Sequence, residues 1–156
     1  WQFNKCFCAT GMKTSNLPTL RAIFGFAVIV LVTGVSSGQE NSVIWEGVYT
    51  AEQAARGETV YTETCIACHG QDLGGNSNSP GLVGMGFMFL WEGRTLGAFY
   101  GKVRSEMPTD RPGQLPAQDY LDVVAYILQK NAFPEGSEEL PSSVETLDSI
   151  SIVSKP

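Results

Sequence analysis

The chain has 156 residues, of which 43% are hydrophobic, and a formal net charge of −6. This length leaves room for one domain. All 16 Asp and Glu residues lie in residues 39–156, together with seven Lys and Arg, so this part carries a net charge of −9. Such acidity argues against partners such as nucleic acid or an anionic membrane surface and favours a protein with a basic patch, although solubility alone explains it equally well.

Residues 1–38 are expected to hold an upstream segment and a secretory signal. Lys13 and Arg21 precede an apolar run over residues 22–35, and small residues follow it up to Gly38. The run is too short to span a bilayer comfortably, so we expect cleavage near Gly38 and a periplasmic or secreted protein. An uncleaved signal that anchors the protein in the membrane is the alternative. The residues before the first methionine are interpreted as upstream translation or a fragment, and the cysteines among them are given no role.

The next part of the chain predicts a helix followed by a loop. The Thr50 hydroxyl is suited to cap a helix that runs from Ala51 towards Cys65. Gly57 on the apolar side of this helix would let another backbone approach closely. Glycine, asparagine and serine dominate residues 70–86, which predicts an irregular loop.

Two more helical stretches follow. Thr95 is a plausible cap for a helix within residues 87–104, and the prolines of residues 107–116 forbid a regular helix there. The final helix, over residues 118–130, has the clearest pattern, with apolar residues three and four positions apart. These are Tyr120, Val123, Val124, Ile127 and Leu128. We expect this helix to cross the first one and close an all-α domain.

The chain is therefore divided into four parts. After the signal, residues 39–49 are assigned to a linker, residues 50–134 to a helical domain and residues 135–156 to an extended C-terminal tail. The tail contains scattered apolar residues among serines. It is interpreted either as a segment laid over the domain or as a docking segment for a partner.

The stretch Cys65-Ile66-Ala67-Cys68-His69 has the C-x-x-C-H spacing of covalent haem attachment. The two thiols lie one helical turn apart, so both can reach the vinyl groups of one porphyrin edge. His69, the only histidine of the chain, would then point an imidazole nitrogen at the iron. Zinc is one alternative, but it lacks an evident fourth ligand beyond residue 38. A redox dithiol is the other, but its usual strand and helix setting is missing.

The order of these features resembles the class I c-type cytochromes, over about residues 50–134. The matching residues are Gly57, Tyr61, the C-x-x-C-H motif, Pro80, Leu82, Met107 and Ala125-Tyr126-Ile127. The resemblance implies a small cytochrome c fold around one haem c. It also implies that the Pro80 carbonyl accepts a hydrogen bond from His69 and fixes the orientation of that ligand. Residues 49–57, 112–115 and 120–128 look more narrowly like the small cytochromes that accompany exported quinoprotein dehydrogenases.

Three methionines beyond the signal compete for the sixth coordination position of the iron. Met107 directly precedes Pro108 and matches the Met-Pro ligand position of the family, so it is the predicted ligand, with Met85 as second choice. Met88 lies between two phenylalanines and is expected to be a core residue. Ligation by His69 and Met107 would raise the reduction potential relative to two imidazoles.

Aromatic residues are predicted to line the haem pocket. The candidates are Phe87, Phe89, Trp91, Phe99 and Tyr100. We expect the indole N–H of Trp91 or the guanidinium of Arg94 to contact a haem propionate, since a buried indole usually needs a hydrogen-bond partner. Core packing explains the same residues nearly as well.

The function expected from these features is electron transfer without chemistry on a substrate. The protein would be an exported electron carrier and not an enzyme, taking electrons from a quinoprotein or other periplasmic dehydrogenase and passing them to an oxidase or another cytochrome. A haem sensor or small peroxidase with an open sixth position is one alternative. A fixed electron-transfer subunit of a larger oxidoreductase, held by its acidic face and C-terminal tail, is another. A membrane partner is expected only if the signal is not cleaved.

Overall fold

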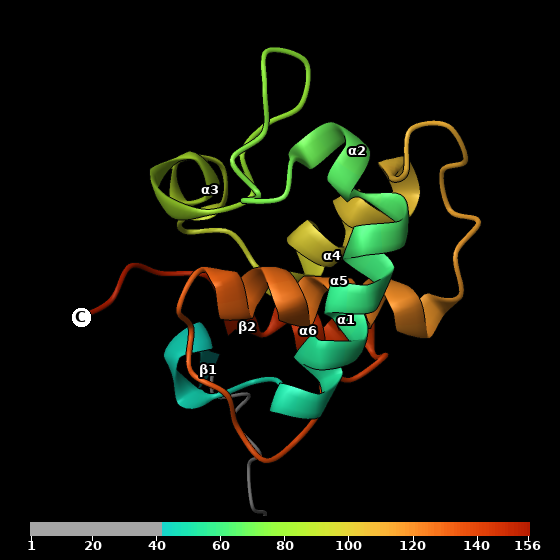
Figure 1. Cartoon of the computed structure of the whole chain (residues 1–156). Helices are drawn as coiled ribbons and strands as arrows, with labels where there is room; N and C mark the ends of the chain where they lie inside the picture. Colours follow the sequence, from blue (N-terminus) through green and yellow to red (C-terminus); the bar gives the residue numbers. More distant parts are fainter. Residues whose placement is uncertain (1–41) are drawn as a thin grey trace, which may run out of the picture. The chain divides into compact units, whose positions relative to one another are not determined.

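The computed structural model of the chain describes residues 42–156 (Figure 1). The expectations for the secretory signal and its alternative as an anchor lie outside the described residues. Along the described part, the elements are β1 (Ser42–Val43), η1 (Ile44–Glu46), α1 (Ala51–Thr64), α2 (Ile66–His69), α3 (Gly84–Trp91), α4 (Leu96–Glu106), α5 (Ala117–Lys130), α6 (Val144–Asp148) and β2 (Ile150–Ser151). This part is therefore mostly helical, as predicted, with two strands of two residues each.

Helix α1 begins and ends where the sequence predicts. The hydroxyl oxygen of Thr50 accepts a hydrogen bond from the backbone N–H of Gln53 at 3.1 Å, which satisfies one of the unpaired donors at the start of the helix. Ala54, Gly57 and Tyr61 are buried along one side. The helix ends one residue before Cys65, so it delivers the C-x-x-C-H motif at its C-terminal end.

Helices α1 and α5 cross at close range, as Figure 1 shows for the two ribbons. At the crossing, Gly57 has no Cβ atom, and a Cβ placed there would lie 1.8 Å from the carbonyl oxygen of Asp122. Every residue from Tyr120 to Leu128 is buried, because α5 is covered on several sides. The predicted crossing of the helix after Thr50 and the helix over residues 118–130 is confirmed.

Helix α3 starts earlier than the predicted loop over residues 70–86 allows. It begins at Gly84, and Val83 before it offers no capping side chain. Instead, the backbone N–H of Gly84 donates to the side-chain oxygen of Asn131 at 2.9 Å. Because this cap comes from the end of α5, no local pattern could have predicted it. Helix α4 begins after Thr95, whose hydroxyl accepts from the N–H of Ala98 at 3.1 Å, as predicted.

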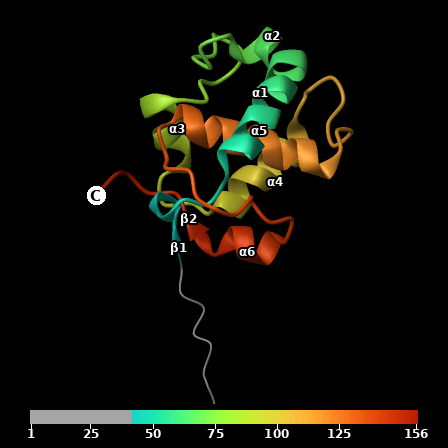
Figure 2. The ribbon, with the colours of Figure 1, turned by 60° about the horizontal axis from the view of Figure 1, so that its bottom comes forward.

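The C-terminal tail packs on the domain and carries its own short elements. Ser143 caps α6, and β2 pairs in parallel with β1 at the other end of the described chain. Four apolar residues of the tail are buried: Leu140, Leu147, Ile150 and Ile152. Figure 2 shows α4 between α5 and α6, which places α6 on the far side of α4 from α5. The tail is thus part of the core rather than only an extended segment.

The residues before α1 also contribute to the core. Ile44 is fully buried and Tyr49 is 1% exposed. The hydroxyl of Tyr49 donates to the backbone carbonyl of Phe133 at 2.6 Å. Residues 42–49 therefore pack with the domain and differ from the linker expected over residues 39–49. No helix between residues 42 and 156 combines the length and the apolar character needed to cross a membrane.

Candidate haem site

The C-x-x-C-H motif forms a tight helical turn at the junction of α1 and α2. The backbone N–H groups of Cys68 and His69 both donate to the carbonyl of Cys65, at 3.2 and 3.0 Å. Cys65 is half-buried, Cys68 is exposed and His69 is 8% exposed. The turn is held from outside as well, because the side chain of Asn76 donates to the Cys68 carbonyl at 2.8 Å.

The imidazole of His69 is fixed in one orientation. Its Nδ1 atom lies 2.9 Å from the carbonyl oxygen of Pro80. A carbonyl oxygen can only accept, so Nδ1 carries the proton in this hydrogen bond. The lone pair of the ring is then on Nε2, which is the atom available to coordinate a metal. This is the contact that the family resemblance implied for Pro80.

The loop that carries Pro80 is attached to the end of α5. Asn131 donates from Nδ2 to the carbonyl of Leu82 at 2.9 Å, and its Oδ1 accepts from the N–H of Gly84 at 2.9 Å. One side chain therefore holds the backbone on both sides of Val83. Since Leu82 follows Pro80 by two residues, this clamp limits how far the Pro80 carbonyl can move from His69.

A cavity of about 590 Å³ opens beside the motif. Its wall combines the motif, the Pro80 loop, the loop after α4 and apolar residues of three helices. The lining residues that matter here are Cys65, Cys68, His69, Pro80, Leu82, Trp91, Phe99, Val103, Met107, Val123 and Ile127. Seven residues were expected to attach, ligate or contact the haem or to orient its ligand. The cavity wall contains six of them, Cys65, Cys68, His69, Pro80, Trp91 and Met107, and lacks Arg94.

The cavity fits a porphyrin attached through two thioethers. Its wall is largely apolar, and it offers two sulfur atoms for attachment, an imidazole with a free Nε2 and a thioether as a second ligand. Burial raises the pKa of the Cys65 thiol, an effect only partly offset by a hydrogen bond to the Thr64 hydroxyl. An environment that disfavours a thiolate suits the uncharged sulfur of a thioether.

The three candidate methionines lie in different surroundings. Met107 lines the cavity at the C-terminal end of α4. Met85 is 90% exposed, and Met88 is half-buried at the edge of the core. Both line a separate open hollow next to Glu92 and are not part of the cavity wall. Met107 is therefore the candidate that the geometry favours.

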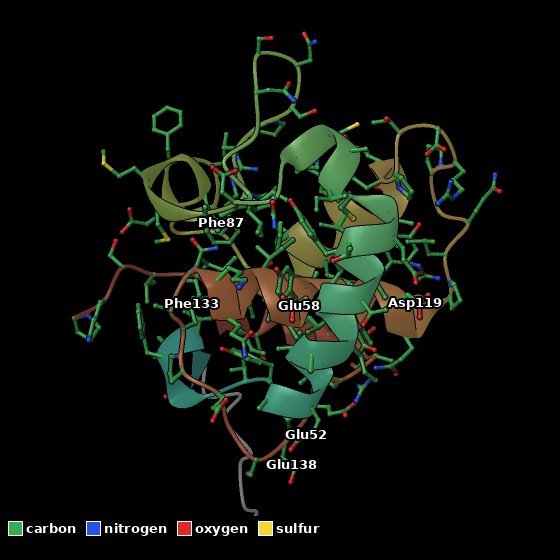
Figure 3. All side chains as sticks on the ribbon, viewed as in Figure 1. Glu52, Glu58, Phe87, Asp119, Phe133 and Glu138 are labelled. Atoms are coloured by element: carbon green, nitrogen blue, oxygen red, sulfur yellow. The ribbon has the colours of Figure 1, made fainter. Side chains whose placement is uncertain are left out.

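The aromatic residues divide between cavity and core. Trp91 and Phe99 line the cavity and pack edge to face, with ring centroids 4.7 Å apart. Phe87 and Tyr100 are buried but are not part of the cavity wall, so the alternative of core packing applies to them. In Figure 3, Phe87 lies near Phe133 in the core, and their ring centroids are 6.4 Å apart.

Phe89 and Arg94 were also expected at the haem pocket, but neither is part of the cavity wall. Phe89 does not line the cavity, because it is 90% exposed on the outer side of α3. The guanidinium of Arg94 lies 5.6 Å from the centre of the Trp91 ring and is not part of the cavity wall. Within residues 42–156, the indole N–H of Trp91 has no hydrogen-bond acceptor. The propionate contacts of Trp91 and Arg94 stay predictions.

The alternatives to haem find no support in the described part of the chain. Among residues 42–156, no group of three or more His, Cys, Asp or Glu side chains could hold a metal ion, as structural zinc would require. A redox dithiol is expected where strands and helices alternate. Here the motif follows α1 and forms the short helix α2, and the sheet of the described residues has two short strands.

Comparison with known proteins gives a family match that includes the C-x-x-C-H motif. Residues 52–127 match the family described as cytochrome C oxidase, cbb3-type, subunit III. Cytochrome c-551 of Bacillus subtilis (strain 168) is 33% identical over 72 residues, which are 46% of this chain and 62% of the relative. The chain thus spans about three-fifths of that relative. The crystal structure of the sulfane dehydrogenase SoxCD from Paracoccus pantotrophus has a TM-score of 0.41 and 20% identity, over 56% of this chain and 53% of that one.

The mostly helical fold and the cavity beside a C-x-x-C-H motif are those of a protein that carries covalent haem. With the family match over residues 52–127, these features support a domain like those of the mono-haem class I c-type cytochromes. The family likeness implies one covalently bound haem c as the cofactor of this domain.

Two residues near the site escaped the sequence analysis. Asn131 follows the predicted final helix and was given no contact, and Tyr120 was interpreted only as one of the apolar residues of that helix. In the structure, the hydroxyl of Tyr120 donates to the carbonyl of Met107 at 2.8 Å. A buried phenol needs a hydrogen-bond partner, which is the signal that could have marked Tyr120. Nothing in the sequence around Asn131 points to the loop at Leu82.

Proposed function

We propose that this protein is an exported mono-haem cytochrome that carries single electrons from a periplasmic dehydrogenase to a downstream acceptor. In this proposal, Cys65 and Cys68 attach the haem, and His69 and Met107 are its axial ligands. One observation carries the proposal: the same cavity is lined by both thiols, by an imidazole whose Nδ1 is bonded to Pro80, and by the thioether of Met107. Export is supported by the signal-like pattern of residues 1–38.

The residues of the chain have distinct tasks in this function. Haem c supplies a one-electron couple between Fe(III) and Fe(II). The carbonyl of Pro80 accepts from Nδ1 of His69, which makes the imidazole a stronger donor and stops its rotation. Trp91 and Phe99 cover the apolar side of the cavity and exclude water. With two protein ligands, no coordination position remains open for a substrate.

The partners are proposed from surface charge. In the view of Figure 3, Glu52 and Glu138 lie at the lower edge, Glu58 on the front of α1 and Asp119 at the right. The three glutamates are exposed. With the net charge of −9 over residues 39–156, such carboxylates favour encounter with a protein that has a basic patch, and the encounter rate should fall as salt is added. The proposed donor is a quinoprotein or other dehydrogenase, and the proposed acceptor is an oxidase or another cytochrome.

Carbon monoxide binding separates the carrier from the sensor or peroxidase. The purified, reduced holoprotein is exposed to carbon monoxide without denaturant, and its visible spectrum is recorded. A carrier with both positions filled by protein ligands should show no change. The matched control is Met107→Ala, which should bind carbon monoxide readily because it has an open position. Rapid binding by the wild type would contradict the proposal and favour a sensor or peroxidase.

A second candidate is a fixed subunit of a larger oxidoreductase. One observation favours it: the family that matches residues 52–127 is described as an oxidase subunit. Size-exclusion chromatography of the native protein at about 0.15 M salt, at which surface charges still interact over about 8 Å, distinguishes the two candidates. A fixed subunit should co-elute with its complex at a constant ratio, whereas a mobile carrier should elute alone.

A further inference from the structure

Tyr120 lies one turn into α5 and is 1% exposed. Its hydroxyl has two partners on the loop between α4 and α5. It donates to the carbonyl of Met107 at 2.8 Å and accepts from the backbone N–H of Leu115 at 3.4 Å. The first distance is that of a good hydrogen bond, and the second is long. One phenol oxygen therefore joins the first residue of the loop to a residue near its end.

The loop has few other attachments near Met107. The N–H of Met107 donates to the carbonyl of Val103 at 3.0 Å, which is the last bond of α4. The N–H groups of Arg111 and Gln114 bond within the loop itself, at 2.9 and 3.3 Å. Within the described residues, Tyr120 is thus the side chain that ties the Met107 backbone to α5.

We infer that Tyr120 is a positioning residue, which holds the backbone of Met107 so that its thioether stays at the iron. The inference rests on the proposed function, because it requires Met107 to be an axial ligand. An external ligand can bind the iron only after the Met107 side chain swings away, which moves the loop. The hydrogen bond from Tyr120 opposes this movement, so its loss should make the displacement of Met107 easier.

The test is a titration of the ferric holoprotein with imidazole as the external ligand. Binding is followed by loss of the near-infrared charge-transfer band of the sulfur–iron bond. Tyr120→Phe removes only the hydroxyl and keeps the ring. One hydrogen bond of this type corresponds to about fivefold in an equilibrium constant, so Tyr120→Phe should bind imidazole about fivefold more tightly than the wild type.

The chain offers a matched control. Tyr49 is equally buried, and its hydroxyl also donates to a backbone carbonyl, that of Phe133, at 2.6 Å. Neither Tyr49 nor Phe133 lines the cavity. Tyr49→Phe should therefore lower the general stability while leaving the imidazole affinity unchanged. A merely structural role of Tyr120 would make the two variants alike in imidazole affinity.

The outcomes separate the inference from the proposed function. An unchanged imidazole affinity in Tyr120→Phe, with the band present in the wild type, overturns the inference alone. A wild type without the band, or a band that persists in Met107→Ala, overturns the proposed ligation and the inference with it. If Tyr120→Phe does not fold, proton NMR of the wild-type protein tests the inference instead. It should show a slowly exchanging Tyr120 hydroxyl proton close to Met107, and a rapidly exchanging one would count against the inference.

Discussion

Gly57 of α1 lies so close to Asp122 of α5 that a Cβ atom on the glycine would fall 1.8 Å from the carbonyl oxygen of the aspartate. The contact fixes the distance between the two helices that frame the site. Helix α1 carries the C-x-x-C-H motif at its end, and α5 supplies Val123 and Ile127 to the cavity wall. The position of the cavity therefore depends on a residue without a side chain.

Gly57→Ala should lower the free energy of unfolding by about 1 to 3 kcal/mol, because the added methyl group forces two backbones apart. Denaturant unfolding of the holoprotein measures this loss. Gly101→Ala in α4 is the matched control, since a Cβ at this exposed glycine meets nothing within 4 Å. It should leave stability unchanged or raise it slightly. Equal effects of the two substitutions would contradict the close crossing.

Asn131→Ala should lower the free energy of unfolding by about 1 to 3 kcal/mol, because the carbonyl of Leu82 and the N–H of Gly84 both lose their partner. Asn131→Asp keeps the oxygen that accepts from Gly84, but it places a carboxylate oxygen against the carbonyls of Leu82 and Ile127, so its loss should be at least as large. Thermal or denaturant unfolding of both variants measures the difference. A loss in Asn131→Asp much smaller than in Asn131→Ala would show that the Nδ2 donor contributes nothing.

The C-terminal tail should be needed for folding. Leu147 is fully buried, and Leu147→Ala is expected to cost about 2 to 5 kcal/mol of stability through the lost contacts and the cavity left behind. Val144, in the same short helix, is 44% exposed, and Val144→Ala should cost less than about 1 kcal/mol. A tail that serves only as a docking segment would give two equally small effects.

The stability should fall at high pH partly because of Tyr49. Burial, with a smaller contribution from nearby Glu135, raises the pKa of Tyr49 to about 12 from 10.0. As pH rises above 10, the unfolded chain releases this proton before the folded protein does. The contribution of Tyr49 to folding is thus complete below pH 10 and is lost as pH rises towards 12.

Unfolding free energies of the wild type and Tyr49→Phe between pH 9 and 12 check this prediction. Burial also raises the pKa of Tyr61, but that group is present in both proteins and cancels in the comparison. The difference between the two proteins should be constant up to about pH 10 and should change above it, with the wild type losing stability faster. Parallel curves over the whole range would refute the role of Tyr49.

Features set by neighbouring residues were predicted well from the sequence. The caps at Thr50 and Thr95 and the crossing at Gly57 need only local pattern and size, and the structure confirms them. The start of α3 was missed because Asn131, 47 residues away, caps it. The tail packs on the domain, which was one of its two interpretations, but its strand was not predicted, since β2 pairs with a strand at the beginning of the described chain.

The same distinction holds for the site. The haem c followed from five consecutive residues, and the class of protein followed from the order of the matching residues over about residues 50–134. The family match over residues 52–127 supports both. The aromatic wall was predicted less well, because a run of aromatic residues does not reveal which side of a helix faces the cavity. Trp91 lines it, whereas Phe89, two residues earlier, points into solvent. The roles of Tyr120 and Asn131 depend on contacts between distant elements and became visible only in the structure.

The most direct test of the account is the near-infrared spectrum of the oxidised holoprotein beside that of Met107→Ala. The proposed ligation predicts a weak charge-transfer band from the sulfur–iron bond in the wild type and its loss in the variant. A wild-type spectrum without the band, with the features of high-spin ferric haem, would mean an open sixth position. That result would contradict the electron-carrier proposal and favour a haem sensor or small peroxidase.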